Sequence, residues 1–204
     1  MVQVKICGLR SLQDIAAADG ADLVGLIVGE PRSRRNLALT VAARLRREVS
    51  GPKVVAVTTR TEAPFLEGVV RLLEPDALQV HGVRTEATAA SIRELVDGRA
   101  QLAFAFHPET TPDFFRISSL ADLVFLDGPG ELGGMGETHD WAAATEAART
   151  VGVPAFLSGG LTPENVAEAV RRVRPYGVDV SSGVEGPEGK DADKVREFLR
   201  RART

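Results

Sequence analysis

Cysteine, methionine, tryptophan and tyrosine are all scarce in this chain. Cys7 is the only cysteine among 204 residues, so no disulfide can form within the chain. The apolar stretches fall well short of the roughly 20 residues that a membrane-spanning helix requires, and no charged and apolar leader precedes the first predicted strand. These absences exclude a disulfide-bonded scaffold and a membrane span, and we expect the protein to lie in the cytoplasm.

An excess of charge of one sign is missing as well. The chain has 25 Lys and Arg residues against 28 Asp and Glu residues, which gives a formal net charge of −3, and the two signs are interspersed rather than grouped. Proteins that bind nucleic acid or anionic membrane surfaces concentrate basic residues on one face or in one segment. We therefore expect a small soluble molecule as the partner, with no nucleic acid and no membrane.

The chain does contain a regular alternation of short apolar segments and longer helical ones. The helical segments, such as PENVAEAVRRV, are rich in Ala, Leu, Arg and Glu. Strands that alternate with helices pair in parallel, and eight such units predict one (β/α)8 TIM barrel over residues 1–204. The eight predicted strands are 2–6, 22–28, 53–57, 76–80, 100–106, 122–126, 154–157 and 178–182.

An open, doubly wound sheet is the alternative to the barrel. Such sheets usually have five or six strands, and the nucleotide-binding ones carry a glycine fingerprint at the first helix, which is absent after Ile6. The least well marked unit lies between the fifth and sixth strands. Residues 108–119 form a short segment with two prolines, so we expect either an irregular helix there or none.

Polar residues stand where predicted strands end, which is where barrels of this kind build their active sites. Lys5 and Cys7 are two residues apart and share a strand face, so the ammonium should favour the thiolate. Each residue alone also fits a structural role, such as a buried thiol, a core histidine, a turn aspartate or a solvated arginine. Their coincidence at one end of the barrel favours a site made of Cys7, Arg35, His81, Asp127, Asp179 and Ser181.

Glycine-rich loops follow the last two predicted strands, where this architecture usually binds phosphate. Bare backbone amides at a helix start bind anions, so a phosphate ester is the expected ligand class, although either loop alone could be a simple left-handed turn. In SGGLTPENV, Thr162 is the expected N-cap and Pro163 the first helical residue. The candidate phosphate ligands in the two loops are Gly159, Gly160, Ser181, Ser182 and Gly183.

A third glycine cluster, GELGGMGET, follows the sixth predicted strand and contains Gly134 and Gly136. It is longer than a tight connection requires, and this length is typical of a mobile loop at an active site.

Five segments, taken in order along the chain, resemble the phosphoribosylanthranilate isomerase family of tryptophan biosynthesis. They are KICGL, DALQVHG, VFLDG with GGMGETHDW, FLSGGLTPENV and GVDVSSGVEG. The resemblance implies a TIM barrel that converts N-(5-phosphoribosyl)anthranilate into 1-(2-carboxyphenylamino)-1-deoxyribulose 5-phosphate by an Amadori rearrangement. It also implies that neither a metal nor an organic cofactor takes part.

The resemblance assigns roles residue by residue. Asp127 aligns with the family's general acid, which protonates the ring oxygen of the sugar, and Cys7 aligns with the general base, which removes the proton from sugar carbon 2. Arg35 aligns with the residue facing the anthranilate carboxylate, and Lys5, His81 and Asp179 with the substrate pocket. The implied phosphate ligands are Gly134, Gly136, Gly159, Gly160, Ser181, Ser182 and Gly183.

The chain departs from the family pattern in the loop after the second strand. Family members often read GFIFAPKSPRYV where this chain reads GLIVGEPRSRRNL, so that Arg34 replaces a proline and Asn36 a tyrosine. Either Arg34 or Arg35 could therefore face the carboxylate.

Two other functions fit the same fold. The histidine-pathway isomerase performs the same rearrangement but is expected to use aspartate where Cys7 stands. A sugar-phosphate-binding barrel without catalysis is disfavoured because both Cys7 and Asp127 are present. For any of these functions a monomer or a homodimer is expected.

Overall fold

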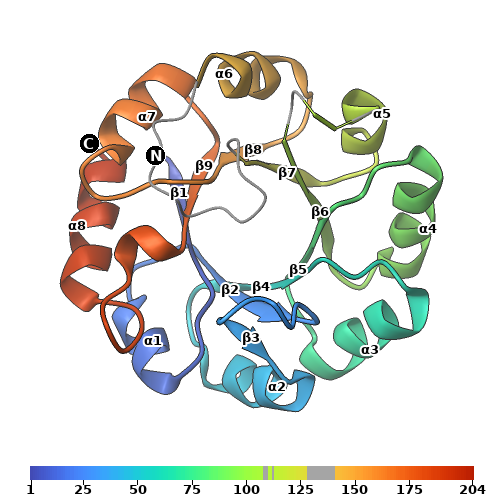
Figure 1. Cartoon of the computed structure of the whole chain (residues 1–204), viewed down its shortest axis with the longest axis horizontal. Coiled ribbons are helices and arrows are strands. Elements are labelled where there is room, and N and C mark those ends of the chain that lie inside the picture. The colour runs from blue at the N-terminus through green and yellow to red at the C-terminus, as the bar shows by residue number, and fades with distance from the viewer. Residues whose placement is uncertain (108–109, 112, 128–140) are drawn as a thin grey trace.

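Eight parallel strands close into a barrel in the computed structural model, which describes residues 1–107, 110–111, 113–127 and 141–204 (Figure 1). The last barrel strand pairs with the first, so the sheet closes on itself. The predicted (β/α)8 barrel is thereby confirmed. Its strands are β1 (Gln3–Cys7), β2 (Leu23–Val28), β4 (Lys53–Thr58), β5 (Ala77–His81), β6 (Gln101–Phe106), β7 (Leu123–Leu126), β8 (Ala155–Leu157) and β9 (Gly177–Val180).

One further strand lies outside the barrel and was not predicted. The two residues of β3 (Asn36–Leu37) pair with Ile27 and Val28 at the end of β2. A side-chain hydrogen bond explains this position, because the Asn36 side-chain oxygen accepts from the Glu30 backbone amide at 2.9 Å. The loop after β2 is therefore closed upon itself and returns to the sheet before the next helix begins.

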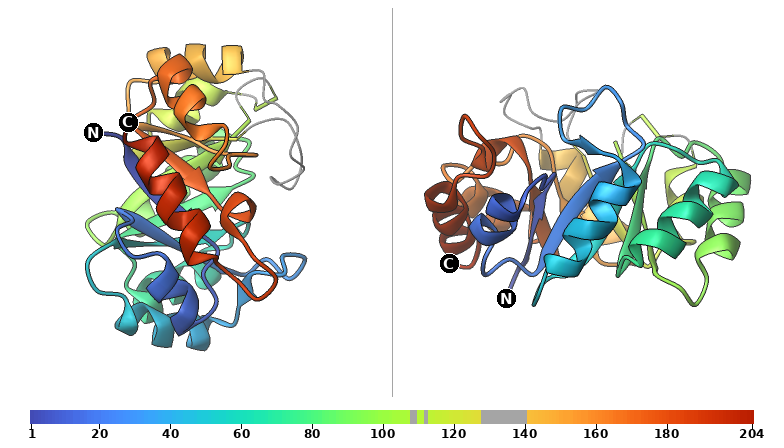
Figure 2. Two further views of the ribbon diagram at one scale, coloured as in Figure 1. Left: turned by 90° about the vertical axis from the view of Figure 1, so that its left-hand side faces the viewer. Right: turned by 90° about the horizontal axis from the view of Figure 1, so that it is seen from below.

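Helices surround the barrel and connect its strands (Figures 1 and 2). The segment for which an irregular helix or none was expected does contain a helix, α5 (Phe114–Ser118), but only of five residues. A 3₁₀ turn, η1 (Ser182–Val184), follows β9. The α-helices are α1 (Leu12–Ala17), α2 (Leu39–Glu48), α3 (Ala63–Leu73), α4 (Glu86–Val96), α5 (Phe114–Ser118), α6 (Trp141–Thr150), α7 (Val166–Val173) and α8 (Ala192–Ala202).

The start of α7 differs from the prediction. We expected Thr162 as the N-cap and Pro163 as the first helical residue, but α7 begins at Val166 and its N-cap is Asn165. The Asn165 side chain accepts from the Thr162 amide at 2.8 Å and donates to the Gly160 carbonyl at 3.0 Å. These bonds hold the preceding residues in a turn, and such local side-chain bonds compete with helix formation.

The strands separate two apolar cores, because successive strand residues point to opposite faces of the sheet. The larger core lies between the strands and the helices and includes Val4, Ile6, Val24 and Leu26. The smaller core fills the barrel interior with Cys7, Leu23, Val55, Val57, Ala77, Ala103, Ala105, Leu123, Phe125 and Phe156. Part of this interior is polar, since Lys5, Gln79 and Asp179 are also buried there. The barrel therefore buries polar residues in its interior, toward the carboxyl ends of the strands.

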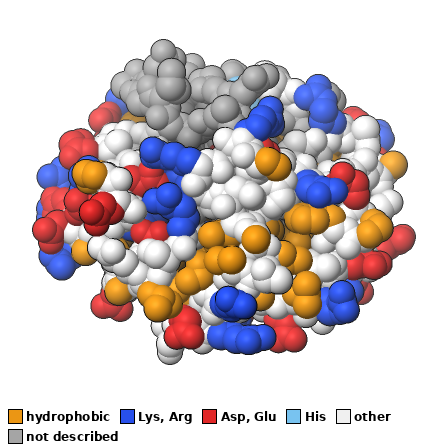
Figure 3. Space-filling view, turned by 60° about the horizontal axis from the view of Figure 1, so that its bottom comes forward, with side chains coloured by type: hydrophobic (Ala, Val, Ile, Leu, Met, Phe, Trp, Pro, Cys, Tyr) orange, Lys and Arg blue, Asp and Glu red, His pale blue; other side chains and the backbone are white. Residues whose placement is uncertain are grey.

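The outer surface mixes both signs of charge. On the face shown in Figure 3, basic and acidic side chains are interspersed with hydrophobic ones, and neither sign forms a continuous region. Among the described residues, no helix combines the length and apolar character needed to cross a membrane.

Candidate active site at the carboxyl ends of the strands

A cavity of about 740 Å³ lies at the carboxyl ends of the barrel strands, within the size range of small-molecule sites. Lys5 and Gly183 are not part of its wall: Lys5 is fully buried one pleat below Cys7, and Gly183 lies in η1. Gly134 and Gly136 lie outside the described residues. The other predicted site residues are brought together in the cavity wall: Cys7, Arg35, His81, Asp127, Gly159, Gly160, Asp179, Ser181 and Ser182.

An ion pair is buried inside the barrel. Lys5 on β1 lies beside Asp179 on the neighbouring β9, with 2.9 Å between Lys5 Nζ and Asp179 Oδ2. The ammonium also lies over the Phe125 ring, 4.8 Å from its centroid. Burial alone would lower the pKa of Lys5, but Asp179 and Cys7 outweigh burial and raise it. Lys5 is therefore a fixed cation, and the second oxygen of Asp179, Oδ1, is buried with no hydrogen-bond partner among the described residues.

Cys7 ends β1 directly above this pair and is nearly buried. We expected the Lys5 ammonium to favour the thiolate. Lys5 does act in that direction, but burial is the larger effect and raises the pKa of the Cys7 thiol, with the Asp179 charge adding to the rise. Lys5 thus favours the thiolate as expected, but the barrel interior penalises the charged form more than this one cation stabilises it.

Gly25 on β2 provides the space that Lys5 and Cys7 occupy. Gly25 pairs with Cys7 across the sheet. A Cβ atom at Gly25 would lie 2.7 Å from Cys7 Sγ and 3.2 Å from Lys5 Cε. Only glycine leaves room for both side chains at this position, which is a common reason for glycine inside a strand.

Asp127 follows β7 and has different surroundings. Its side chain is about one-third exposed (31%). The Ser158 hydroxyl donates a short hydrogen bond to Asp127 Oδ1, and His81 Nδ1 lies 3.5 Å from Oδ2. Gln79 Nε2 lies 3.0 Å from His81 Nε2. With the Gln79 amide nitrogen as donor, His81 Nε2 accepts, which places the proton of the neutral ring on Nδ1. Asp127 thus accepts a hydrogen bond from Ser158 and has the His81 ring near its other oxygen.

The loops after β8 and β9 carry backbone amides at one side of the cavity. Gly159 and Gly160 both have positive φ, at 83° and 59°, which glycine adopts without strain. The amides of Gly160, Ser182 and Gly183 donate to no acceptor within the described part of the chain. A Cβ at Gly183 would lie 2.0 Å from the Leu161 carbonyl oxygen, so the two loops touch only because this residue is glycine. Neighbouring amides without a protein acceptor suit an anion.

Arg35 reaches the cavity from the loop after β2. Its Nε and Nη2 donate to Glu185, at 2.6 Å to Oε1 and 2.9 Å to Oε2. Arg34 also contacts Glu185, but its side chain is 70% exposed whereas that of Arg35 is 15% exposed. Gly8 makes room for Arg35, since a Cβ at Gly8 would lie 2.5 Å from Arg35 Cδ. Of the two arginines, Arg35 is the one that lies against the end of β1.

Several residues of the site were not predicted from the sequence. Gln79, Ser158, Glu185 and Lys190 all contact predicted site residues. Glycine in the middle of the apolar segment DLVGLIV was a signal for Gly25, because glycine weakens a strand unless something approaches closely. Within the described residues, no group of three or more His, Cys, Asp or Glu side chains has the arrangement of a metal site.

Comparisons with known proteins agree with one another. A family model described as N-(5'phosphoribosyl)anthranilate (PRA) isomerase matches residues 4–201. The N-(5'-phosphoribosyl)anthranilate isomerase of Methanothrix thermoacetophila is 39% identical over 211 residues, covering 100% of this chain and 99% of the relative.

Solved structures give the same picture. The phosphoribosyl anthranilate isomerase of Thermotoga maritima matches with a TM-score of 0.84 and 33% identity, covering 100% of this chain and 99% of that one. Another solved isomerase of this name, in complex with reduced 1-(o-carboxyphenylamino)-1-deoxyribulose 5-phosphate, matches with a TM-score of 0.80 and 32% identity at the same coverage.

Proposed function

Since the chain belongs to the phosphoribosylanthranilate isomerase family and converts N-(5'-phosphoribosyl)anthranilate into 1-(2-carboxyphenylamino)-1-deoxyribulose 5-phosphate in tryptophan biosynthesis, we propose that Cys7 and Asp127 perform its two proton transfers. The observation that carries this proposal is that both side chains enter one cavity from different strands. A molecule bound between them can therefore meet a proton donor and a proton acceptor at once.

The first step opens the furanose ring. Asp127, as the carboxylic acid, donates its proton to the ring oxygen while the bond from that oxygen to sugar carbon 1 breaks. The lone pair of the anthranilate nitrogen forms the second bond of an iminium. The carboxylate left on Asp127 is then met by the hydroxyl of Ser158 and the Nδ1 proton of His81, which stabilise its charge.

The second step removes the proton from carbon 2. The Cys7 thiolate takes this proton, and the electron pair of the broken C–H bond flows into the iminium to give an enolamine. The enolamine becomes the ketone when carbon 1 gains a proton and the hydroxyl on carbon 2 loses one. Lys5 keeps a positive charge beneath the sulfur throughout, so the thiolate forms next to a cation rather than in an apolar interior.

Binding is proposed to use both ends of the substrate. The phosphate would accept hydrogen bonds from the amides of Gly160, Ser182 and Gly183, and Arg35 would face the anthranilate carboxylate. Asp179 and His81 lie between these ends, where the sugar would be. We propose a cytoplasmic enzyme, monomeric or homodimeric, whose partner is this phosphorylated aminosugar.

Loss of substrate fluorescence during turnover tests the assignment. Groups that transfer protons typically contribute about 10²–10⁴ in rate, so Cys7→Ala and Asp127→Asn should each lower kcat by about that factor. Neither change should prevent folding, which circular dichroism checks. Near-normal turnover in either variant would remove that residue from the mechanism, and a rise in KM with an unchanged kcat would make it a binding residue instead.

A further inference from the structure

We propose that Glu185 is a positioning residue for substrate recognition, which holds the Arg35 guanidinium in the orientation that receives the anthranilate carboxylate. This inference rests on the proposed contact between Arg35 and that carboxylate. Glu185 does not need to touch the substrate in order to act, because it works through Arg35.

The geometry of the pair supports this role. Glu185 engages Arg35 through two parallel bonds, at 2.6 Å to Nε and 2.9 Å to Nη2, and the Glu185 side chain is only 10% exposed. A two-point contact fixes the plane of the guanidinium as well as its position. The remaining nitrogen, Nη1, has no acceptor among the described residues, and Arg35 lines the cavity. Glu185 thus holds the Nε and Nη2 edge of the Arg35 guanidinium, and Nη1 remains available to a ligand.

The charges around Glu185 do not balance. Arg34, Arg35 and Lys190 all form ion pairs with this one carboxylate. Burial opposes the charged form of Glu185, but the hydrogen bonds from Arg35 and the charge of Lys190 outweigh it and lower the pKa of Glu185 to about 2. Glu185 therefore stays ionised, and a surplus of positive charge remains, which a carboxylate on the ligand would complement.

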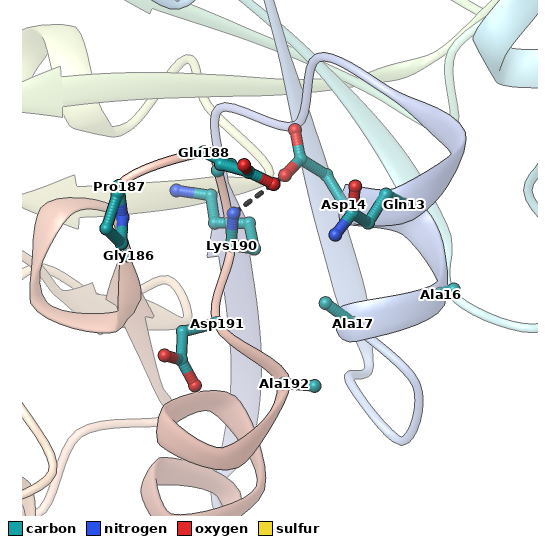
Figure 4. A pocket seen from close by; sticks show the side chains of 11 residues that line it. Gln13, Asp14, Ala16, Ala17, Gly186, Pro187, Glu188, Lys190, Asp191 and Ala192 are labelled. Carbon is teal, nitrogen blue, oxygen red and sulfur yellow. Dashed lines mark hydrogen bonds between the residues drawn. The ribbon is translucent and has the colours of Figure 1, made fainter.

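Lys190 fixes Glu185 from the other side. Lys190 Nζ, almost fully buried, donates to Glu185 Oε1 and to the Ser181 carbonyl, both at 3.0 Å. The Lys190 backbone amide in turn donates to Asp14 Oδ1 at 2.7 Å, which ties the loop before α8 to α1 (Figure 4). Glu185 is thereby held by residues that do not depend on the substrate.

This network connects the two ends of the cavity. Glu185 directly follows η1, whose amides face the proposed phosphate site, whereas Arg35 belongs to the loop after β2. Cys7 lies between the two loops, because β1 pairs with β9 on one side and with β2 on the other. The bonds between Glu185 and Arg35 therefore tie the loop of the proposed phosphate site to the loop that would face the anthranilate ring.

Steady-state kinetics of Glu185→Gln test the proposal. The amide keeps the shape of the side chain but loses its charge, so the guanidinium is no longer held at two points. Misplacement of a binding group by about 1 Å commonly costs on the order of 10²-fold, and we expect kcat/KM to fall roughly 10- to 100-fold, mostly through KM. Glu185→Asp, which keeps the charge, should recover part of the loss. Glu188→Gln, an exposed neighbour on the same loop, should behave like wild type.

A double-mutant cycle with Arg35→Lys separates the possible failures. If Glu185 acts through Arg35, Glu185→Gln should cause little further loss in the Arg35→Lys background. Additive losses, or a lower KM in Glu185→Gln, would overturn the positioning role. A normal kcat/KM in Arg35→Lys alone would overturn the proposed carboxylate contact instead.

Competitive inhibition by inorganic phosphate distinguishes positioning from general damage to the loops. Its inhibition constant should stay within about twofold of wild type in Glu185→Gln, since the backbone amides of η1 bear the anion site. A parallel loss of phosphate binding and of thermal stability would reduce Glu185 to a structural residue.

Discussion

The two proposed proton-transfer groups share one cavity but differ in their surroundings. Cys7 is nearly buried at the end of β1, above the Lys5–Asp179 ion pair and against Gly25. Asp127 is about one-third exposed after β7, accepts a hydrogen bond from Ser158 and lies near the His81 ring. The base is thus controlled by charge and burial, and the acid by hydrogen bonds.

This difference fits the two chemical tasks. The acid must give up its proton and later regain one, which a partly solvated carboxyl with flanking donors can do. The base must take a proton from carbon, for which a desolvated sulfur is suited once it is ionised. Burial raises the pKa of Cys7, so Lys5 beneath it limits this rise without abolishing it. An added atom beside the buried thiol should therefore lower turnover more than the loss of one hydrogen-bond donor beside Asp127.

Gly25→Ala changes the surroundings of Cys7, and we expect it to lower activity more than Ser158→Ala, which changes the surroundings of Asp127. The new Cβ would lie 2.7 Å from Cys7 Sγ, so sulfur or strand must shift. We expect unfolding stability to fall by about 1–3 kcal/mol and kcat/KM to fall by about 10²-fold. Chemical denaturation and turnover measure the two effects.

The matched control is Gly68→Ala. Gly68 lies in α3, and a Cβ there would contact only Leu39 Cδ2, at 3.8 Å. This substitution should raise the free energy of unfolding by about 0.5–1 kcal/mol and leave turnover normal. A Gly25→Ala variant that turns over like wild type would show that the position of the thiol is not critical.

The pH dependence of Cys7 reactivity should sharpen the comparison. Iodoacetamide alkylates the thiolate, so the alkylation rate should rise about 10-fold per pH unit until the thiol has titrated. Because burial raises the pKa of Cys7, this rise should continue above about 8.5, the ordinary value for cysteine. Alkylation of Cys7 by iodoacetamide should follow the same curve in wild type and in Asp127→Asn. A rise that is complete near pH 7 would contradict the effect of burial.

Ser158→Ala changes the surroundings of Asp127 and should have the smaller effect on kcat. One donor to the carboxylate is lost while His81 remains, and a hydrogen bond of this kind contributes about 1 kcal/mol, so kcat should fall roughly fivefold. Ser118→Ala removes another buried hydroxyl that donates to a backbone carbonyl, and it should lower stability similarly without changing kcat. Equal kcat values in both variants would remove Ser158 from the mechanism.

The barrel could be predicted because its determinants are local. Short apolar segments alternate with helical ones, and all eight predicted strands were found within two residues of their expected bounds. The Thr162 hydroxyl does accept from the Glu164 amide at 3.2 Å, as a capping residue would. The start of α7 was missed because residues 163–165 form a turn, in which the Asn165 side chain bonds to the Thr162 amide. The short β3 depends on the Asn36 side chain in the same way.

Site residues could be predicted from the sequence only where a polar residue stands at the end of a predicted strand. Cys7, His81 and Asp179 stand at such ends, whereas Glu185 and Lys190 act through bonds across loops, which no spacing reveals. The net effect on the thiol was also not predictable, since the balance between burial and the Lys5 charge depends on how deeply the barrel encloses both.

The Lys5–Asp179 pair places this protein under two kinds of natural selection that oppose each other. Replacing a buried ion pair with well-packed apolar residues often leaves a fold as stable as before, or stabilises it by about 1–4 kcal/mol. Selection for stability alone would therefore tend to replace these two residues, and only the need for turnover would retain them. A variant in which both residues are replaced by well-packed apolar ones should therefore be at least as stable as wild type and yet lose turnover.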